Sequence, residues 1–244
     1  MRATDFRHKL NIYGKKIALV SALVGCAVLA NAQQQTRWVQ RNNPNYDDRK
    51  LTYGFLIGLH SSIYHIDYSD AFASQPLDTL FSVNADWSSG FSLGFIVNYR
   101  LGEFFDLRLT PEVAFYEQKV IYQYTNETFQ DARVESTMVE LPLLLKYKSA
   151  RRGNIRMYMI GGAKPGIEAS GKKDQTKAEL EISKFNLSLE AGFGFDLYYP
   201  LFKFSPELRF SRGVVDILDN RTNAFGYPLQ RVTTNTITLY LLFQ

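Results

Sequence analysis

The stretch from Phe185 to Leu197 reads FNLSLEAGFGFDL, and every second residue in it, beginning with Phe185, is apolar. Small or polar residues lie between them: Asn186, Ser188, Glu190, Gly192, Gly194 and Asp196. Because successive side chains of a β-strand point to opposite faces, this pattern predicts a strand with one apolar and one polar face. The fold then depends on how often the pattern recurs and on which face meets the solvent.

Seven further segments alternate in the same way, so we expect eight strands of about 9 to 13 residues, close to the length that a tilted strand needs to cross a bilayer. The predicted strands are 51–60, 89–101, 105–115, 139–147, 155–167, 185–197, 202–210 and 236–243. Pro111, Pro142 and Pro206 fall inside three of them. Since proline has no backbone N–H to donate, we expect these residues to lie at bulges.

The predicted connections alternate between long and short. The long ones are 67–88, 118–138, 168–184 and 212–234, and the short ones are 102–104, 149–154 and 198–201. In an up-and-down arrangement, all long loops lie at one end and all short turns at the other, as in outer-membrane barrels. An even number of strands then places both chain termini on the periplasmic side.

The composition of the two faces indicates which one is inside. The polar face holds Gly, Ser, Asn and Thr with few charges, unlike the Lys- and Glu-rich exterior expected of a soluble barrel. The other face is rich in Phe and almost uncharged. We therefore predict an all-β protein, an eight-stranded antiparallel up-and-down transmembrane β-barrel, with its apolar face towards lipid. A soluble lipocalin-like barrel with the faces exchanged is the alternative.

Charged residues of the polar face would lie in the lumen, where an unpaired charge is costly. We expect them to form a paired network that holds the barrel together, and a proton or ligand site is the alternative interpretation. They are Asp106, Arg108, Glu112, Glu140, Lys146, Lys164, Glu190, Asp196, Lys203, Glu207 and Arg209.

The first 32 residues have the parts of a secretory signal: a basic start, an apolar run over 17–30 and the small-residue site Ala30-Asn31-Ala32. The apolar run is shorter than the roughly 20 residues of a membrane-spanning helix. We expect 1–32 to be a cleaved signal peptide, 33–50 a periplasmic tail and 51–244 the barrel. Alternatively, 23–26 resembles a lipoprotein cleavage box, which would make Cys26 a lipid-bearing residue.

Several classes of function find little support in the residues. The net charge of +4 is carried by the first 32 residues, so the rest of the chain offers no basic footprint for a nucleic acid. His60 and His65 have opposite parity on a regular strand, which argues against a two-histidine metal site. A catalytic pair of His60 with Ser61 or Ser62 is the weak enzyme alternative. We expect no enzymatic activity, no cofactor and no small-molecule substrate.

Four segments resemble the PorT family of Bacteroidetes outer-membrane barrels, and together they extend over essentially the whole mature chain. They are Asn43-Pro44-Asn45-Tyr46-Asp47 followed by Tyr53-Gly54-Phe55, ELPLLLKY at 140–147, GGAKPG at 161–166 and FSPELRFS at 204–211. The Asn43–Asp47 motif is the most specific of them. The resemblance implies a place in the Gram-negative outer membrane and a part in the type IX secretion system, which exports folded virulence proteins and adhesins. The implied partners are outer-membrane lipid and other secretion components. An outer-membrane adhesin that acts through the long loops, or a lipid A modifying enzyme, is the alternative.

Overall fold

The structure is a computed structural model, and it describes residues 42–69, 80–124, 129–169, 182–219 and 228–244. Contacts divide the chain into two units, Met1–Gln40 and Arg41–Gln244, and every described residue belongs to the second.

The predicted signal peptide (1–32), the Cys26 alternative and the first part of the predicted tail therefore lie outside the described residues. None of the described residues forms a helix with the length and apolar character that crossing a bilayer demands.

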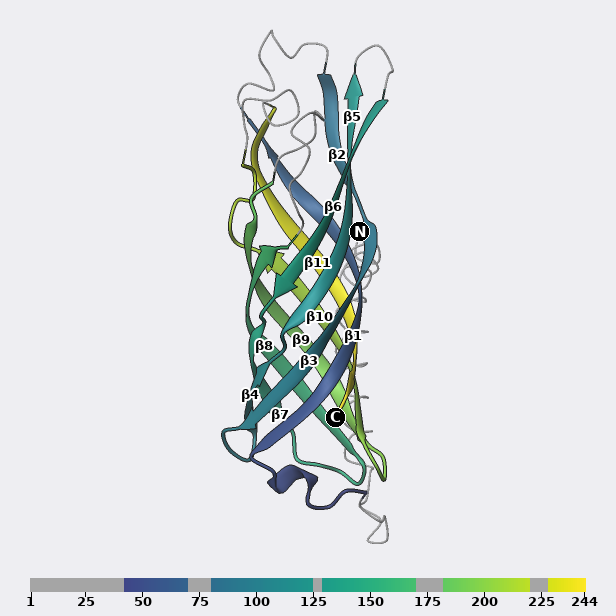
Figure 1. The fold of residues 1–244 in the computed structure, drawn as a ribbon, viewed down its shortest axis with the longest axis vertical. Helices are drawn as coiled ribbons and strands as arrows, with labels where there is room; N and C mark the ends of the chain where they lie inside the picture. Colours follow the sequence, from purple (N-terminus) through teal and green to yellow (C-terminus); the bar gives the residue numbers. More distant parts are fainter. Residues whose placement is uncertain (1–41, 70–79, 125–128, 170–181, 220–227) are drawn as a thin grey trace, which may run out of the picture. The chain divides into compact units, whose positions relative to one another are not determined.

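The described residues form eleven β-strands that close into a barrel of tilted strands (Figure 1). The strands are β1 (Leu51–Tyr68), β2 (Leu80–Asp86), β3 (Ser88–Arg100), β4 (Phe105–Leu109), β5 (Glu112–Tyr124), β6 (Phe129–Glu140), β7 (Leu143–Lys148), β8 (Ile155–Glu168), β9 (Phe185–Tyr198), β10 (Lys203–Gly213) and β11 (Leu229–Phe243). A short 3-10 helix, η1 (Tyr46–Asp48), precedes β1. All pairings are antiparallel, and the pairing of β8 with β9 closes the ring. The all-β, antiparallel prediction is confirmed.

The prediction of eight unbroken strands is wrong for the described part of the chain. The predicted strand 105–115 is divided into β4 and β5 at Thr110-Pro111, and 139–147 is divided into β6 and β7 at Leu141-Pro142. β2 lies within a segment predicted to be a loop. Proline lacks the N–H that the ladder needs, which explains the first two breaks.

The expectation that these prolines sit at bulges is also wrong. Across Pro111, β3 pairs Val97 with Leu109 and Leu93 with Val113, so equal numbers of residues face each other. The register of β6 and β7 against β8 likewise continues past the second break. The proline carbonyl still accepts a bond from the neighbouring strand, at 2.9 Å from Phe95 N–H to Pro111. The ladder thus loses donors at these positions but keeps its register.

Two further residues, Pro206 and Trp87, bear on the expected bulges. Pro206 lies inside β10, opposite Leu241 of β11, without a shift of register. A true bulge occurs at Trp87, between β2 and β3. There, five steps from Asp86 to Phe91 face only four steps of β5, from Lys119 to Phe115.

Several strands run farther than the sequence pattern indicates. β1 continues to Tyr68, β5 continues to Tyr124, and β11 already begins at Leu229. Much of the predicted long loops 67–88, 118–138 and 212–234 is therefore strand, and the barrel wall extends beyond its apolar exterior.

In the part of the barrel where β1 begins, the exterior is an apolar belt of exposed side chains on nearly every strand. We use "apolar belt" for Leu51, Tyr53, Phe55, Leu59, Phe91, Leu93, Phe95, Tyr99, Leu107, Leu109, Val113, Phe115, Val139, Leu143, Leu145, Tyr147, Ile155, Met157, Met159, Leu189, Phe193, Leu208, Phe210, Ile237 and Leu239. Phe193 is 52% exposed and Phe95 69% exposed. Exposed apolar surface of this extent is typical of a protein that contacts a membrane or other proteins.

The part of the barrel beyond the apolar belt has the opposite arrangement, because apolar side chains fill its interior. This outer core consists of Tyr64, Val83, Val120, Tyr122, Ile217, Leu218, Leu229 and Val232. It is drawn from β1, β2, β5, β11 and the segment after β10. The Asp216 carboxylate holds that segment by accepting bonds from the backbone N–H groups of Leu218 and Val232, at 3.1 and 3.0 Å.

Candidate functional site

The lumen at the level of the apolar belt is filled by charged side chains. The structure brings all the charged residues predicted for the polar face into this lumen, and each of them is at most 4% exposed. Two groups share the space. The mouth layer is Asp106, Lys146, Lys148, Asp196 and Lys203, and the carboxyl layer is Glu112, Glu140, Glu190 and Glu207 with Arg108, Lys164 and Arg209.

The mouth layer lies next to the end of the barrel where β1 begins, which we call the N-terminal mouth. The Lys146 ammonium donates to both oxygens of Asp196, at 2.9 and 2.7 Å. Asp196 also accepts from the Ser205 hydroxyl at 2.7 Å and lies 3.9 Å from the Lys203 ammonium. The buried carboxylate is thereby compensated, which is the condition for placing it in the interior.

Lys148 and Asp106 form a second ion pair of the mouth layer, 2.5 Å apart. The sequence reasoning did not include Lys148 in the network. Its parity is the same as that of Lys146, two residues before it on β7, so the signal was present in the sequence.

The carboxyl layer is built on shared cations. Arg108 donates to Glu207 at 2.7 Å, and Arg209 pairs with Glu207 and, at 3.2 Å, with Glu190. Lys164 lies 3.2 Å from a Glu140 oxygen and 3.4 Å from a Glu190 oxygen.

Tyrosines that the sequence reasoning did not assign to the lumen complete the network. The Tyr158 hydroxyl donates to Glu207 at 2.5 Å, and the Lys146 ammonium lies 3.6 Å from the centre of the Tyr158 ring. The Tyr116 hydroxyl donates to Glu140 at 3.0 Å. Parity on β5 and β8 places both residues on the inward face, but the choice of partner depends on contacts between distant strands.

Two glycines explain how such large side chains fit into a narrow barrel. A Cβ atom on Gly194 would lie 2.5 Å from the Tyr158 hydroxyl, and one on Gly58 would lie 2.3 Å from the Ser92 hydroxyl. A side chain at either position would displace these inward-facing hydroxyl groups, whereas glycine leaves them in place. The small residues of the polar face therefore make room for the network.

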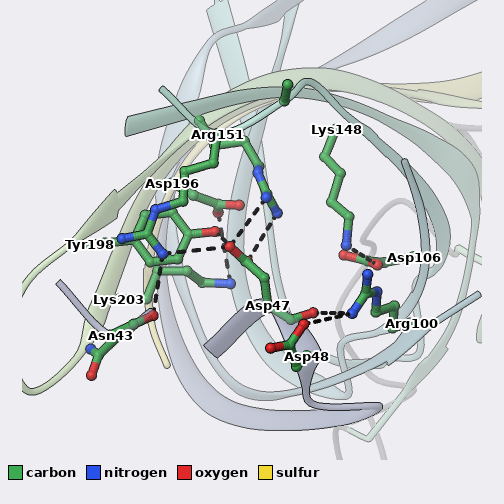
Figure 2. Close-up of polar contacts among 12 residues, drawn as sticks. Asn43, Asp47, Asp48, Arg100, Asp106, Lys148, Arg151, Asp196, Tyr198 and Lys203 are labelled. Atoms are coloured by element: carbon green, nitrogen blue, oxygen red, sulfur yellow. Dashed lines mark hydrogen bonds and ion pairs between the residues drawn. The ribbon is translucent and has the colours of Figure 1, made fainter. Parts of the chain in front are cut away.

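The N-terminal mouth is closed by residues 42–50, which include the predicted motif Asn43–Asp47. Figure 2 shows Asp47 among the side chains of this mouth. The Asp47 carboxylate accepts from Arg156 at 3.0 and 3.2 Å and from the Tyr198 hydroxyl at 2.8 Å. The Arg151 guanidinium lies 3.5 Å from the same carboxylate. The turn after β7, the start of β8 and the end of β9 thus hold the segment through one acidic side chain.

Of the other residues in the motif, Asn43 and Tyr46 anchor the segment, whereas Pro44 and Asn45 are exposed. Asn43 has a positive φ of 46°, which asparagine tolerates better than most residues, and its amide donates to the Tyr199 carbonyl at 2.8 Å. Tyr46 lies edge-on to Tyr198 with ring centres 5.9 Å apart, and burial raises the pKa of Tyr46 to about 12. Pro44 and Asn45 are exposed.

The cavities at the two ends of the network are small. One of about 20 Å³ lies between η1 and the mouth layer, and one of about 40 Å³ lies between the carboxyl layer and the outer core. The second is lined by Tyr116, Gln118, Glu140, Lys164 and Asn186, with Tyr64 and Ile217 among its apolar walls. Each has room for at most a few water molecules.

Of the histidines, His60 and His65 belong to the described residues, and they face opposite sides of the barrel wall. His60 points inward and packs against Tyr116 with the rings tilted and their centres 4.3 Å apart, whereas His65 is exposed near Asp67. Ser62 is buried and lies 3.5 Å from the Gln118 amide nitrogen. In the described ranges, no group of three or more His, Cys, Asp or Glu residues is placed to hold a metal ion.

The chain is similar to several solved structures. They include Neisserial surface protein A (10% identity, TM-score 0.43, 80% of this chain and 98% of that one) and OprG of Pseudomonas aeruginosa (12%, 0.46, 80% and 95%). Ail, the attachment invasion locus protein of Yersinia pestis, is also similar (13%, 0.34, 80% and 99%). No curated protein sequence matches the chain.

A family model described as an outer membrane protein beta-barrel domain matches residues 31–219, which is well over half of the chain. The match includes η1 and all the strands except β11. With the closed antiparallel barrel, the apolar belt and the charged lumen, this match shows that the chain belongs to the outer membrane β-barrel domain family.

Proposed function

We propose that this chain is an eight-stranded barrel of the Bacteroidetes outer membrane and a non-enzymatic component of the type IX secretion system. The observation that carries the proposal is the position of the Asn43–Asp47 motif in the N-terminal mouth. The most specific part of the PorT resemblance is anchored in the N-terminal mouth by Asp47, next to exposed residues that a partner could contact.

Eight crossings follow from the way in which the divided strands share neighbours. β2 and β3 both pair with β5, β4 and β5 both pair with β3, and β6 and β7 both pair with β8. Each of these pairs of strands crosses once. The outward apolar run from Leu51 to Leu59 has a length of roughly 30 Å at about 3.3 Å per residue, or roughly 23 Å in height at a tilt of about 40°. That height is close to the apolar band of known barrels, about 25 Å.

The filled lumen argues against conduction as the function. The ion-paired layers occupy the interior, and the cavities of about 20 and 40 Å³ at their ends are too small for a peptide or a folded protein. The barrel would therefore act through its two ends. With both termini in the periplasm, the exposed residues Pro44, Asn45, Asp48, Arg49 and Lys50 would face periplasmic secretion components.

Deletion of the gene tests the secretion role. We expect type IX cargo proteins to accumulate in the periplasm of the deletion strain, and export to return when the wild-type gene is supplied on a plasmid. The amount of an unrelated outer-membrane barrel should stay constant, which controls for general envelope damage. Normal export of cargo by the deletion strain would reject the proposal.

An adhesin is the second candidate, and the outer core favours it. Tyr122, Val120 and Leu229, each at most 1% exposed, pack the barrel beyond the apolar belt, so this part would present the adjoining loops on a firm base. Under this hypothesis, the deletion strain exports cargo normally but adheres less to its target surface. Unchanged adhesion together with impaired export would exclude it.

A further inference from the structure

Glu112 differs from the other lumenal carboxyl groups in having no cation beside it. It is 3% exposed, and its two oxygens accept bonds from the Ser92 hydroxyl at 3.0 Å and the Tyr240 hydroxyl at 2.8 Å. In the described part of the chain, no Lys, Arg or His side chain makes an ion pair with it. A buried carboxylate with only neutral donors is a costly arrangement.

The neighbour across the sheet adds to this cost. Glu112 on β5 and Glu140 on β6 are directly opposite each other in the ladder, and both point into the lumen. Like charges at directly opposed positions of two strands repel each other. The repulsion is stronger here than on a surface because water does not screen it.

The cations of the carboxyl layer are already shared among its other members. Lys164 contacts Glu140 and Glu190, whereas Arg209 contacts Glu190 and Glu207. The layer holds the carboxyl groups of Glu112, Glu140, Glu190 and Glu207 against the cations of Arg108, Lys164 and Arg209. One carboxyl group is therefore in excess.

From this geometry we infer that Glu112 is an uncharged carboxylic acid and forms a proton-binding site in the middle of the lumen. One proton balances the layer and removes the repulsion between Glu112 and Glu140. The contacts of Glu112 suit either form, since a hydroxyl group is both donor and acceptor. When Glu112 carries the proton, its O–H donates to Ser92 or Tyr240, and that hydroxyl turns towards another acceptor.

The titratable and hydroxyl groups around this site come from eight strands: His60 on β1, Ser92 on β3, Tyr116 on β5, Glu140 on β6, Lys164 on β8, Glu190 on β9, Arg209 on β10 and Tyr240 on β11. The mouth layer has three cations for two acids, but its lysines pair with Asp106 and Asp196. Within the described residues, none of these lysines makes an ion pair with Glu112, and Coulomb attraction weakens with distance.

Infrared spectroscopy of the full-length barrel in detergent micelles tests the inference directly. At pH 7, we expect the wild type to show the C=O stretch of a protonated carboxylic acid, and we expect Glu112→Gln to lose it. Glu135→Gln is the matched control, since Glu135 is exposed on the outer face and should leave the band unchanged. Absence of the band from the wild type, or its persistence in Glu112→Gln, would overturn the assignment.

The pH dependence of stability gives a second readout. At pH 7, the unfolded chain has released the proton of Glu112, whose ordinary carboxyl group is then ionised, whereas the folded barrel retains it. The folded state thus binds more protons, so stability falls as the pH rises, and it does so until the folded barrel also loses this proton. Relative to Glu112→Gln, the unfolding equilibrium constant of the wild type should rise by up to about tenfold per pH unit. Parallel curves for the two proteins would contradict the inference.

The protonation of Glu112 does not depend on the proposed role in secretion. Export of cargo could fail in its own test while the infrared band remains, and the converse also holds.

Discussion

The barrel has one continuous wall but two kinds of interior. At the level of the apolar belt, side chains such as Phe193 point outward, and buried charges such as Arg108 and Asp196 point inward. Beyond the belt, Val120 and Tyr122 point inward, whereas Glu117 and Lys119, on the same strand, have the outward parity. The strand geometry is the same in both parts. The difference teaches that the medium around the wall determines which side chains fill the interior. Where hydrocarbon surrounds the barrel the interior is charged, and where water surrounds it the interior is an ordinary apolar core.

The two interiors are stabilised by different terms. Around the mouth layer and the carboxyl layer, stability depends on complete pairing, because the loss of one partner strands a desolvated charge. In the outer core, stability depends on the apolar area that is removed from water. The same kind of substitution should therefore have different effects in the two regions.

The largest effect is expected for Asp196→Asn in the mouth layer. This change leaves the Lys146 ammonium, 1% exposed, without its carboxylate, in a layer whose cations already exceed its acids. We expect a loss of about 3–5 kcal/mol in the free energy of unfolding, measured by urea titration in micelles. Asp67→Asn beyond the belt is the matched control and should change stability by no more than about 0.5 kcal/mol. Similar values for the two variants would show that the lumenal pairs are not required.

A lysine on the outer wall tests the other half of the comparison. Phe193→Lys places a charge in the apolar belt and should cost about 2–4 kcal/mol when the barrel is folded into liposomes. His65→Lys puts the same side chain on the outer wall beyond the belt, where His65 is already exposed to solvent, and should cost little. Equal tolerance at both positions would mean that water surrounds the whole wall, as in the lipocalin-like alternative.

Two leucines of β11 allow the outer core to be compared with the belt. Leu229 is 1% exposed in the outer core, and Leu239 is 43% exposed in the belt. Leu229→Ala leaves a cavity and should cost about 2 kcal/mol, seen as faster hydrogen exchange beyond the belt. Leu239→Ala should cost less than about 1 kcal/mol, because lipid chains fill the space. Unchanged exchange in Leu229→Ala would show that the far part draws no stability from its core.

Alternation in the sequence was sufficient to predict the barrel wall and the inward charges, because parity fixes the face of each residue on a strand. It failed where the outer core begins, although Val120 and Tyr122 continue the inward parity of Gln118 on β5. The sequence pattern predicts a connection over 118–138, where the structure has the continuation of β5 and most of β6. A water-exposed strand also carries polar residues on its outer face, so the contrast between faces is lost.

Pairings between residues far apart in the sequence could not be predicted for a different reason. Asp47 meets Arg156 and Tyr198, which are 109 and 151 residues away in the sequence. Local periodicity contains no information about such contacts, since they depend on how the ring of strands closes. The predicted motif Asn43–Asp47 was identified by resemblance alone, without any indication that it closes the mouth.

The smallest effect is expected for Asp47→Asn, because residues 42–50 lie outside both interiors. The variant keeps the size of the side chain but weakens its bonds to Arg156, so we expect a loss of about 1 kcal/mol. That loss should concern the segment alone, appearing as faster hydrogen exchange at 42–50 while the urea midpoint of the barrel stays constant. Asp48→Asn is the matched control, since the Asp48 side chain is 79% exposed and lies 3.7 Å from Arg100. If Asp47→Asn lowered the urea midpoint as much as Asp196→Asn does, the mouth segment would be part of the lumenal network, and the barrel would have one charged interior that extends to its very end.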